Sequence, residues 1–596
     1  MDSDKLISSL NPQQQEAVVN TIGPMVVLAG AGSGKTRVLT AKVAKLIADK
    51  VCLADEIMMV TFTNKAAAEM KERVGRQLGF IGTFHSFGAR ILRENAFLVG
   101  LNPGFVIYDE NDKEELLKKI IEETSGKKSN SASHVSNKIS GAKDALLSAS
   151  EYASIISGPS GAEIANYYQI YQERLKANNA VDFDDLIYLV VKLLDTNREV
   201  LSKLHSKYKY FLIDEFQDTN YAQYLLSKLL ANQTKNITVV GDFSQSIYSW
   251  RGADIANLSN FSKDFEGTKI IYLEKNYRST APILDFAYEV ISKNESHPIL
   301  RLHTDKTLGE EVEVVGVENE EEEALFVIDK TRKALQAGGR VAVLYRINAQ
   351  SRLIEEAFLR AGLPYILVGG VRFYERKEVK DLLSYLRLIL NPSDEISLKR
   401  AEKIGKRKLE AFFSWRNMSG FEGEIDSPTI ELLDKVKEVT QYLSVFDEDK
   451  PEEAARLENI KELRGVAMNH PILTEFLETI ALVESEYSAS EKLQKDDRGV
   501  VLMTMHACKG LEFETVIIVG AEEGIIPHSR SLEDRGQMEE ERRLFYVAVT
   551  RAMQNLFITY TKKRFFFGRR SYSEPSRFIK DRLKNFDPAG EEIIYF

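Results

Sequence analysis

The residue types best suited to chemistry lie first in a glycine-rich turn, AGAGSGKT, at positions 29–36. A short apolar run precedes this turn and a helical pattern follows it, which predicts a strand, a loop and a helix N-terminus. Exposed backbone N–H groups at such a junction bind phosphate, and the helix dipole favours the negative charge. Lys35 is expected to reach the β- and γ-phosphates, and the Thr36 hydroxyl to hold Mg²⁺. The turn therefore predicts binding of a nucleoside triphosphate.

The strict form of this loop has glycine where the chain has Ala29. A glycine-rich loop that merely turns the chain is the alternative, but GKT would then stand between a strand and a helix by chance. The residues predicted to line the nucleotide are Ala29, Gly30, Ala31, Gly32, Ser33, Gly34, Lys35, Thr36 and Arg37.

Two carboxylates follow another apolar run in FLIDEFQD, at positions 211–218. An aspartate at the end of a strand near a phosphate loop can hold Mg²⁺, which is the role expected for Asp214. Glu215 is placed to polarise a water for in-line attack on the γ-phosphate. Asp-Glu after a strand is also common at surface turns. The position of this pair after a phosphate loop, together with Gln217 and Asp218, favours the functional interpretation.

Positioning these groups requires buried strands, and short apolar runs between helical patterns supply two sets of them. The first set is 25–29, 57–62, 208–214, 237–242 and 269–274. The second set is 311–317, 340–346, 500–506, 515–520 and 555–561. Such an alternation is typical of parallel sheets with helices on both faces. We expect an α/β protein with two such modules, into which two mainly helical stretches, 86–195 and 372–496, are inserted.

Composition excludes several classes of protein. With 596 residues, 44% of them hydrophobic and 28% charged, the chain resembles an ordinary globular protein of about four domains. No apolar stretch approaches the ~20 residues of a membrane span, and the N-terminus lacks the apolar segment of a signal peptide. Cys52 and Cys508 are too few for a disulfide framework or a four-cysteine metal site. We expect a cytoplasmic protein that does not contact membranes.

Charge leaves the choice of partner open. A net charge of −10 argues weakly against a nucleic-acid-binding protein, but a local basic or aromatic groove can operate on an acidic chain. The acidic run at 318–323, ENEEEE, is expected to be a solvated surface loop.

Taken in order, the motifs form one known series. They are LNPQQQEAV (10–18), AGAGSGKT (29–36), VTFTNKAAAEM (60–70), GTFHSFGARIL (82–92), FLIDEFQDTN (211–220), VVGDFSQSIYSWRGAD (239–254), LEKNYRST (273–280), VLMTMHACKGLEF (501–513) and EEERRLFYVAVTRA (539–552). From about residue 10 to residue 580, the chain resembles the superfamily 1A DNA helicases of the UvrD/PcrA/Rep type.

This resemblance implies two RecA-like domains that clamp ATP, each carrying an insertion. It places domain 1A at 1–85 and 196–275, insertion 1B at 86–195, domain 2A at 276–371 and 497–585, insertion 2B at 372–496, and a short tail at 586–596. Insertion 2B is shorter than in familiar members, and GKRKL (405–409) resembles their glycine-containing turn only weakly. The chain is also expected to lack the extended tail through which some relatives bind RNA polymerase.

The resemblance assigns further nucleotide contacts outside the glycine-rich turn. Gln14 resembles the glutamine that reads adenine, and Tyr277 resembles the residue that stacks on the base. Gln245, in GDFSQS, resembles the γ-phosphate sensor. Phe243 and Ser244 stand before it where the family usually has acidic or alanine residues, which alters the loop beside the γ-phosphate.

Two arginines resemble the arginine fingers of the second domain, Arg278 in NYR and Arg551 in VTRA. Glu512, in KGLEF, resembles a contact to the ribose or nucleotide edge. Fixed guanidinium groups stabilise the charge that spreads over the γ-phosphoryl oxygens, and one finger accelerates hydrolysis by about 10³–10⁵. Because the fingers lie on the other domain, hydrolysis is expected to require closure of the cleft. An ordinary surface salt bridge is the alternative for each arginine taken alone.

The resemblance also implies a track for single-stranded DNA. The residues expected to contact it are Phe62, His85, Tyr248, Trp250, Arg251, Thr504, His506 and Phe567. Aromatic stacking tolerates any base and contributes ~1–3 kcal/mol per base, which suits a motor that must pass every sequence. Core packing is the alternative for each aromatic taken alone. Trp415 belongs to no motif and is expected to pack in the core.

The activity that this resemblance implies is that of an ATP- and Mg²⁺-dependent 3′-to-5′ DNA helicase and single-stranded DNA translocase in repair, replication or recombination. Its expected partners are single-stranded DNA, junctions with a 3′ tail, and repair or replication proteins, and it is expected to act as a monomer or transient dimer. One alternative is a translocase that removes bound proteins with little unwinding. An ATP-switched nucleic-acid clamp without motor activity is disfavoured by Glu215 and both arginines, and a small-molecule P-loop kinase by the later motifs.

Overall fold

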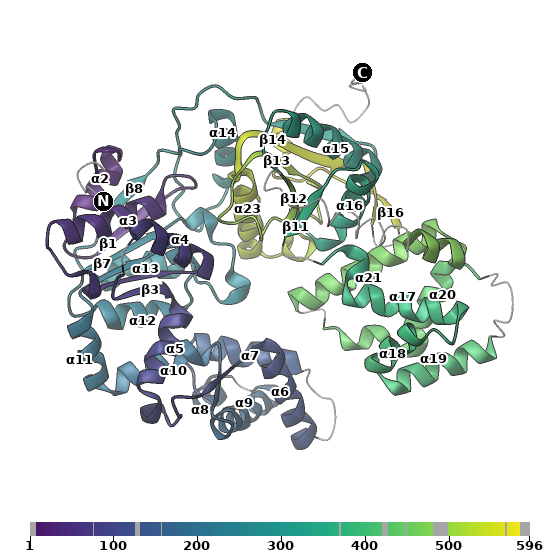
Figure 1. Cartoon of the computed structure of the whole chain (residues 1–596), viewed down its shortest axis with the longest axis horizontal. Coiled ribbons are helices and arrows are strands. Elements are labelled where there is room, and N and C mark those ends of the chain that lie inside the picture. The colour runs from purple at the N-terminus through teal and green to yellow at the C-terminus, as the bar shows by residue number, and fades with distance from the viewer. Residues whose placement is uncertain are drawn as a thin grey trace. The chain divides into compact units, whose positions relative to one another are not determined.

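The computed structural model of the chain describes residues 7–75, 77–125, 132–156, 158–368, 371–419, 427–447, 450–480, 499–566 and 569–583. Its contacts form two compact units, drawn in Figure 1: Met1–Tyr277 with His297–His303, and Arg278–Ser296 with Thr304–Phe596. Each unit contains its own six-stranded sheet.

The sheet of the first unit has the strand order β3-β2-β6-β7-β1-β8, and every pair is parallel. Its strands are β1 (Met25–Ala29), β2 (Ile57–Thr61), β3 (Phe80–Thr83), β6 (Tyr210–Ile213), β7 (Ile237–Gly241) and β8 (Lys269–Leu273). Alternate residues of β1 enter two separate cores, Val26 and Leu28 in one and Met25 and Val27 in the other. Both faces of the sheet are therefore covered, which is why its central strands are continuous apolar runs.

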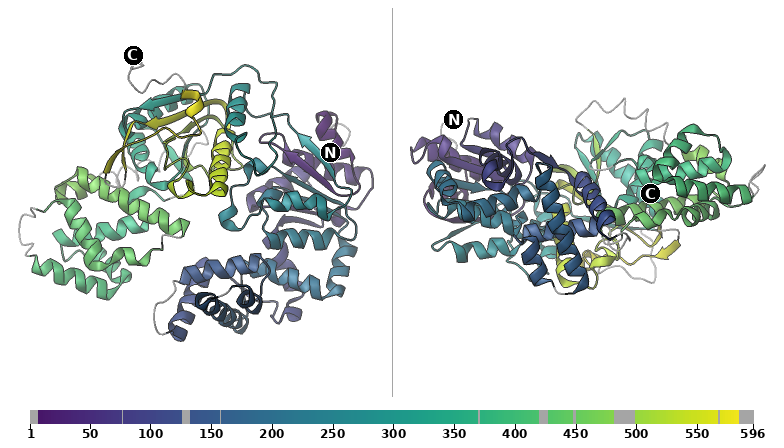
Figure 2. Two further views of the ribbon diagram at one scale, coloured as in Figure 1. Left: turned by 180° about the vertical axis from the view of Figure 1, so that it is seen from behind. Right: turned by 90° about the horizontal axis from the view of Figure 1, so that it is seen from below.

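Helices pack around this sheet, as the two views of Figure 2 show. They include α2 (Pro12–Val19), α3 (Lys35–Ala48), α4 (Asn64–Val74), α5 (Phe84–Glu94), α12 (Tyr221–Ala231) and α13 (Ala256–Asp264). The carboxyl ends of parallel strands meet at one edge of a sheet, where ligands bind in open α/β folds. The glycine-rich turn follows β1, DEFQD follows β6, and GDFSQ follows β7, so this edge collects the predicted nucleotide site.

A mainly helical region interrupts the first sheet between β3 and β6. Its elements are β4 (Val106–Tyr108), α6 (Glu110–Ser125), α7 (Ala132–Asp144), α8 (Ala149–Ile155), α9 (Pro159–Ala177), β5 (Ala180–Asp182), α10 (Asp185–Thr196) and α11 (Arg198–Lys207). The first four of these helices enclose their own apolar core. Beside it the buried Lys143 Nζ lies 2.7 Å from an oxygen of Asp182 and 2.8 Å from one of Asp185. Buried charges are tolerated there because they are paired.

The sheet of the second unit has the order β11-β12-β10-β13-β14-β9, again with every pair parallel. Its strands are β9 (Glu313–Val317), β10 (Val341–Tyr345), β11 (Tyr365–Val368), β12 (Val500–Thr504), β13 (Phe513–Ile518) and β14 (Ala552–Thr561). Helices α14 (Ala281–Ile291), α15 (Glu320–Gln336), α16 (Ser351–Arg360) and α23 (Arg535–Val549) pack around it. The predicted α/β class with parallel sheets is confirmed, while the short strands β3 and β11 were not predicted.

Further helices lie between β11 and β12 in the described parts of the chain. They include α17 (Lys377–Leu390), α18 (Glu395–Ile404), α19 (Lys406–Met418), α20 (Thr429–Thr440) and α21 (Pro451–Asn469), and residues 473–480 are also helical. Their core is continuous with that of the sheet, because Leu386 and Leu433 belong to the same apolar cluster as Val343 of β10. Trp415 packs against this cluster with its ring centroid 5.8 Å from that of Phe412, so it has the core role that the sequence predicts.

The acidic run at 318–323 is not the solvated loop that the sequence predicts. Asn319 is the N-cap of α15, and four glutamates fill the first turn of that helix, where the helix dipole favours negative charge. Glu320 is 7% exposed and Glu323 is 3% exposed, so part of the run is buried. The prediction was wrong because it considered the charges of the run without the distant cation that pairs with Glu323.

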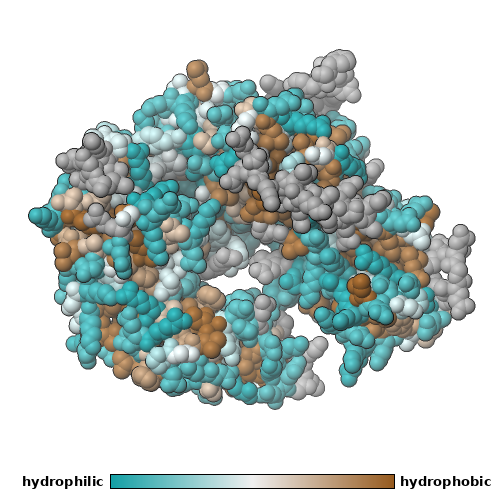
Figure 3. Space-filling view, viewed as in Figure 1, coloured by the Kyte–Doolittle hydropathy of each residue, from teal (hydrophilic) through white to brown (hydrophobic). Residues whose placement is uncertain are grey.

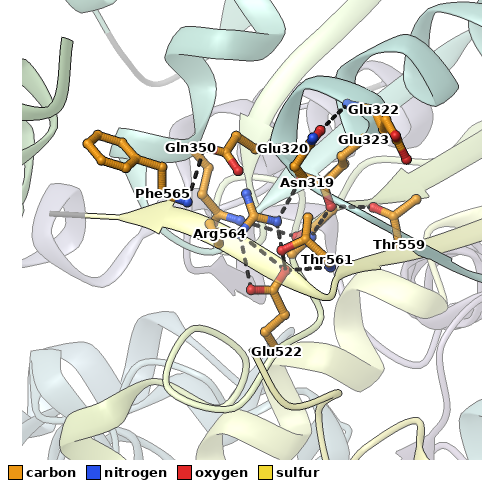
Figure 4. A network of polar contacts seen from close by, with 12 residues as sticks. Asn319, Glu320, Glu322, Glu323, Gln350, Glu522, Thr559, Thr561, Arg564 and Phe565 are labelled. Atoms are coloured by element: carbon orange, nitrogen blue, oxygen red, sulfur yellow. Dashed lines mark hydrogen bonds and ion pairs between the residues drawn. The ribbon is translucent and has the colours of Figure 1, made fainter. Parts of the chain in front are cut away.

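That cation is Arg564, on strand β15 (Lys563–Phe566), which pairs antiparallel with β16 (Arg569–Tyr572). Figure 4 shows its guanidinium between two carboxylates, and its Nη2 lies 2.7 Å from an oxygen of Glu323 and 2.7 Å from one of Glu522. Glu323 also accepts a hydrogen bond from the Thr559 hydroxyl at 2.6 Å. The network fixes the base of the β15–β16 hairpin against α15 and β14.

No helix in the described parts of the chain is long and apolar enough to cross a membrane. On the face drawn in Figure 3, hydrophilic residues cover most of the described surface and apolar residues form small separate groups. Such isolated apolar groups are normal on a protein surface.

Candidate functional site

The glycine-rich turn leads from β1 into α3 with the backbone that a phosphate loop requires. Gly32 and Gly34 have φ angles of 65° and 86°, a region that side chains disfavour. Gly34 is the N-cap of α3, so the first N–H groups of that helix follow directly. Ser33 stabilises the turn because its hydroxyl donates to the Gly30 carbonyl at 2.7 Å.

Lys35 lies against the carboxylates that follow β6 and β7. Its Nζ is 3.0 Å from Glu215 Oε2. Burial opposes protonation of Lys35, yet nearby carboxylates, Glu215 foremost, raise the pKa of its ammonium group. The lysine is therefore charged and lies at the edge where a triphosphate would add further negative charge.

Asp214 and Thr36 form a second polar contact at this edge. The Thr36 hydroxyl donates to Asp214 Oδ2 at 3.1 Å. Burial, followed by repulsion from Glu215, raises the pKa of the Asp214 carboxyl to about 7. A hydroxyl and a carboxylate are oxygen ligands of the kind that Mg²⁺ prefers, so these two residues fit the predicted metal position.

Glu215 has a backbone φ of 51°, which is unfavourable for a residue with a side chain. One oxygen of its carboxylate, Oε2, accepts from both Lys35 Nζ and Gln217 Nε2, at 3.0 and 2.6 Å. Gln217 in turn accepts a hydrogen bond from Asp242 N at 3.0 Å through its Oε1. One amide side chain thus joins the carboxylate after β6 to the loop after β7.

The loop after β7 holds Gln245 in place. Its Nε2 donates to Asp242 Oδ2 at 2.6 Å, and Asp242 Oδ1 accepts from Ser244 N at 3.0 Å. Burial raises the pKa of the Asp242 carboxyl despite the nearby Lys35. The predicted phosphate sensor therefore lies beside the lysine and carboxylate cluster.

The residues predicted to bind the base also lie at the glycine-rich turn. Gln14 Nε2 donates to the Ser33 carbonyl at 2.8 Å, and Tyr277 N donates to the Gly32 carbonyl at 3.0 Å. The Tyr277 hydroxyl accepts from Asn11 Nδ2 at 2.8 Å, while 41% of the residue remains exposed. Its ring is therefore held at the turn and partly exposed, with Lys275 Nζ 5.7 Å from the ring centroid.

Phe62, just after β2, and Tyr248 and Trp250, which follow Gln245 in the chain, form an aromatic row. The rings of Phe62 and Tyr248 stack with centroids 5.6 Å apart and an interplanar angle of 12°. Trp250 follows at 6.3 Å from Tyr248 and is 47% exposed. The structure thus brings together three of the predicted DNA contacts and leaves their outer end accessible.

A further aromatic was missed by the sequence analysis. Phe183, between β5 and α10, is 46% exposed and lies edge-on to His85 with ring centroids 5.9 Å apart. Its sole signal in the sequence was an aromatic within the acidic turn VDFDD. The side chain of Arg251 and all of Phe567, both predicted DNA contacts, lie outside the described residues.

Within the second unit, three predicted nucleotide residues lie together. Arg278 Nε is 2.7 Å from Glu512 Oε2, and Arg278 Nη1 donates to the Thr550 carbonyl at 3.1 Å. Arg551 is 2% exposed, and its Nε donates to the Val547 carbonyl at 3.0 Å. Although burial opposes it, Arg278 and then Arg551 lower the pKa of the Glu512 carboxyl.

Two predicted DNA contacts lie at the end of β12 and just after it, in the same unit. Thr504 ends that strand, and its hydroxyl accepts from Ala507 N at 3.3 Å. His506 lies in the turn after it and is partly buried.

Comparison with known proteins places both units in one family. Residues 10–266 match the family model of the UvrD/REP helicase N-terminal domain, and residues 271–422 and 422–563 match that of the UvrD-like helicase C-terminal domain. The chain is 41% identical to ATP-dependent DNA helicase PcrA of Bacillus subtilis, over 99% of this chain and 88% of the relative. It is 40% identical to PcrA of Staphylococcus aureus, over 97% of this chain and 86% of the relative, and 39% identical to PcrA of Staphylococcus epidermidis, over 99% and 89%.

These matches span the glycine-rich turn, the carboxylates after β6, the loop after β7 and the arginine pair of the second unit. The matched ranges therefore cover the motifs on which the sequence resemblance rests. The chain belongs to the UvrD/REP helicase family.

Proposed function

We propose that this chain is an ATP-dependent 3′-to-5′ DNA helicase and single-stranded DNA translocase. The observation that carries the proposal is the pair of hydrogen bonds made by Gln217. They join Glu215, the residue suited to activate water, to the loop that continues into Trp250. An enzyme that couples hydrolysis to movement along a strand needs such a connection between its two sites.

Each residue of the nucleotide site has a chemical role in this proposal. Lys35 binds the β- and γ-phosphates, which replace Glu215 as its partner. Thr36 and Asp214 hold Mg²⁺, which when bound neutralises charge on the phosphate oxygens. Glu215 is then available to orient and deprotonate the attacking water. Gln245 contacts the γ-phosphate and registers its loss.

Arg278 and Arg551 are proposed to complete this site by stabilising the charge of the γ-phosphoryl group during transfer. Their clustering with Glu512 supports a common role. Arg551 is buried and bound by backbone carbonyls, so its guanidinium is already oriented. Orientation before the reaction is what makes a fixed charge effective in catalysis.

The aromatic row supplies the proposed DNA track. Phe62, Tyr248 and Trp250 offer stacked faces that accept any base, and Phe183 with His85 adds a second aromatic pair. The connection back to the nucleotide site is short, because the Ser246 hydroxyl donates to the Gln217 carbonyl at 3.2 Å. We propose that a base stacked on Trp250 shifts this loop and with it Gln217.

The domain assignment is proposed as follows: 1A at 1–85 and 196–275, 1B at 86–195, 2A at 276–371 and 497–585, and 2B at 372–496. The shorter second insertion supports one alternative, a translocase that removes bound proteins with little unwinding. The biological process is proposed to be DNA repair, replication or recombination, with a single strand or a junction with a 3′ tail as the substrate.

Unwinding of three duplexes tests the proposed activity and its direction. The duplexes carry a 3′ single-stranded tail, a 5′ tail or no tail. We expect ATP-dependent strand separation with the 3′ tail alone. Separation from the 5′ tail alone would contradict the proposed polarity, and ATP-driven displacement of a bound protein without separation would favour the translocase.

Glu215→Gln should abolish turnover while leaving the fold and DNA binding in place. The amide is isosteric but cannot accept the proton of water, so kcat should fall by about 10²–10⁴. Steady-state hydrolysis in saturating single-stranded DNA measures this, with Glu199→Gln on the exposed face of α11 as the control. Near-normal kcat in Glu215→Gln would remove the assignment of the general base.

Trp250→Ala should weaken DNA binding more than ATP binding. Loss of one stacked base is expected to cost about 1–3 kcal/mol of DNA-binding free energy. Fluorescence anisotropy gives the Kd for labelled single-stranded DNA, and hydrolysis kinetics give KM for ATP. The control is Phe97→Ala, which removes an aromatic that is 75% exposed in the same unit. Equal losses in both constants would indicate a packing role for Trp250.

A further inference from the structure

One segment that no motif singled out contacts the nucleotide site at both of its ends. This is His297–His303, whose contacts place it in the first unit although the residues on both sides of it belong to the second. The segment has no helix or strand and follows α14 in the chain. What holds it in the first unit is a small set of contacts with the loops at the carboxyl edge of the sheet.

The first end of the segment binds the loop that carries Gln245. His297 is 7% exposed, and its ring stacks on Phe243 with centroids 6.0 Å apart and an interplanar angle of 27°. Its Nε2 lies 3.3 Å from the Ser244 hydroxyl, within hydrogen-bond distance. Phe243 and Ser244 are the residues of the GDFSQS motif that differ from the usual family pattern, and His297 contacts both.

The other end binds the glycine-rich turn and the segment after β8. A Cβ on Gly30 would lie 2.3 Å from Leu302 Cδ2, so the leucine side chain packs directly on the backbone of the glycine-rich turn. His303 N donates to the Glu274 carbonyl at 3.0 Å, and Asn276 N donates to the His303 carbonyl at 2.8 Å. These contacts fix the segment independently of His297.

The two residues just before His297 contact the second unit instead. Glu295 N and Ser296 N donate to the two carboxylate oxygens of Glu539, on α23 of the second unit, at 3.0 and 3.2 Å. The chain therefore passes from a contact with α23 to a contact with the loop that carries Gln245 between the consecutive residues Ser296 and His297.

We propose that His297 is a positioning residue for ATP hydrolysis, which fixes the Phe243–Ser244 loop so that Gln245 and Asp242 keep their geometry. The proposal rests on the proposed function, because it takes Gln245 as the residue that contacts the γ-phosphate. His297 itself does not touch the reacting atoms. It acts through Ser244, whose backbone N–H donates to Asp242 Oδ1 while Gln245 Nε2 donates to Asp242 Oδ2.

This placement assigns His297 an effect on the rate of hydrolysis rather than on nucleotide affinity. The groups that would bind the phosphates and the base, Lys35 and Gln14, hydrogen-bond to Glu215 and to the Ser33 carbonyl rather than to Phe243 or Ser244. Catalytic rate is more sensitive than binding to small shifts, because a displacement near 1 Å can reduce a rate by about 10²-fold.

The test measures kcat and KM for ATP in saturating single-stranded DNA, together with Kd for that DNA. His297→Ala is expected to lower kcat by about tenfold or more while KM and Kd stay within about twofold of the starting values. His297→Gln, which keeps a hydrogen-bonding group, should recover part of the loss. His205 lies on α11 and contacts the Leu229 carbonyl. His205→Ala is the matched control and should leave kcat, KM and Kd unchanged.

A double-mutant cycle tests whether His297 acts through Ser244. If it does, Ser244→Ala lowers kcat, and the Ser244→Ala/His297→Ala variant is no slower than His297→Ala alone. Additive losses would overturn the proposal, as would a parallel loss of kcat, ATP affinity, DNA affinity and melting temperature without rescue by glutamine. If His297→Ala does not fold, Ser244→Ala decides alone, and a normal kcat in that variant overturns the proposal.

Gln245→Ala separates this proposal from the proposed function. Normal hydrolysis in Gln245→Ala would contradict the assignment of the phosphate sensor itself. Slow hydrolysis in Gln245→Ala with normal hydrolysis in His297→Ala would overturn the role of His297 alone.

Discussion

The contact between Lys35 and Glu215 is the interaction on which the rest of the site depends. One buried ammonium group is placed among three carboxylates, those of Asp214, Glu215 and Asp242. Buried charge is costly unless it is paired, and this cluster contains more negative groups than positive ones. Burial and mutual repulsion raise the pKa of the Asp214 carboxyl to about 7, which is a sign of that imbalance. A metal-bound triphosphate would relieve it, because the metal would neutralise carboxylates and the phosphates would engage the lysine.

The cluster also constrains the loops that lead away from it. Glu215 is held in an unfavourable backbone conformation, and Gln217 spans from its carboxylate to the loop after β7. That loop carries Gln245 first and then Tyr248 and Trp250 of the aromatic row, so it is bound at one end by the nucleotide site and exposed at the other. His297, which follows α14 in the chain, stacks on Phe243 of the same loop. A few direct contacts therefore connect the Glu215 carboxylate with Trp250.

Much of the fold could be predicted because the longer strands are apolar runs in parallel sheets covered on both faces. Strands β3 and β11 were missed because FIGT and YILV are too short to stand out. Gln14 and Trp250 were singled out because they belong to motifs of the family that the chain resembles. The burial of Glu323 could not be predicted, since its partner Arg564 lies 241 residues further along. The 297–303 segment was missed for the same reason: its contacts are long-range and follow no periodic pattern.

We propose that strand binding at the aromatic row alters the carboxylate and lysine cluster at the nucleotide site. The rate of ATP hydrolysis by the purified full chain, measured with and without single-stranded DNA at saturating ATP and Mg²⁺, tests this coupling. We expect a large increase in kcat when the DNA is added. An equal rate in its presence and absence, with DNA binding confirmed in the same samples, would mean that the two sites are not coupled.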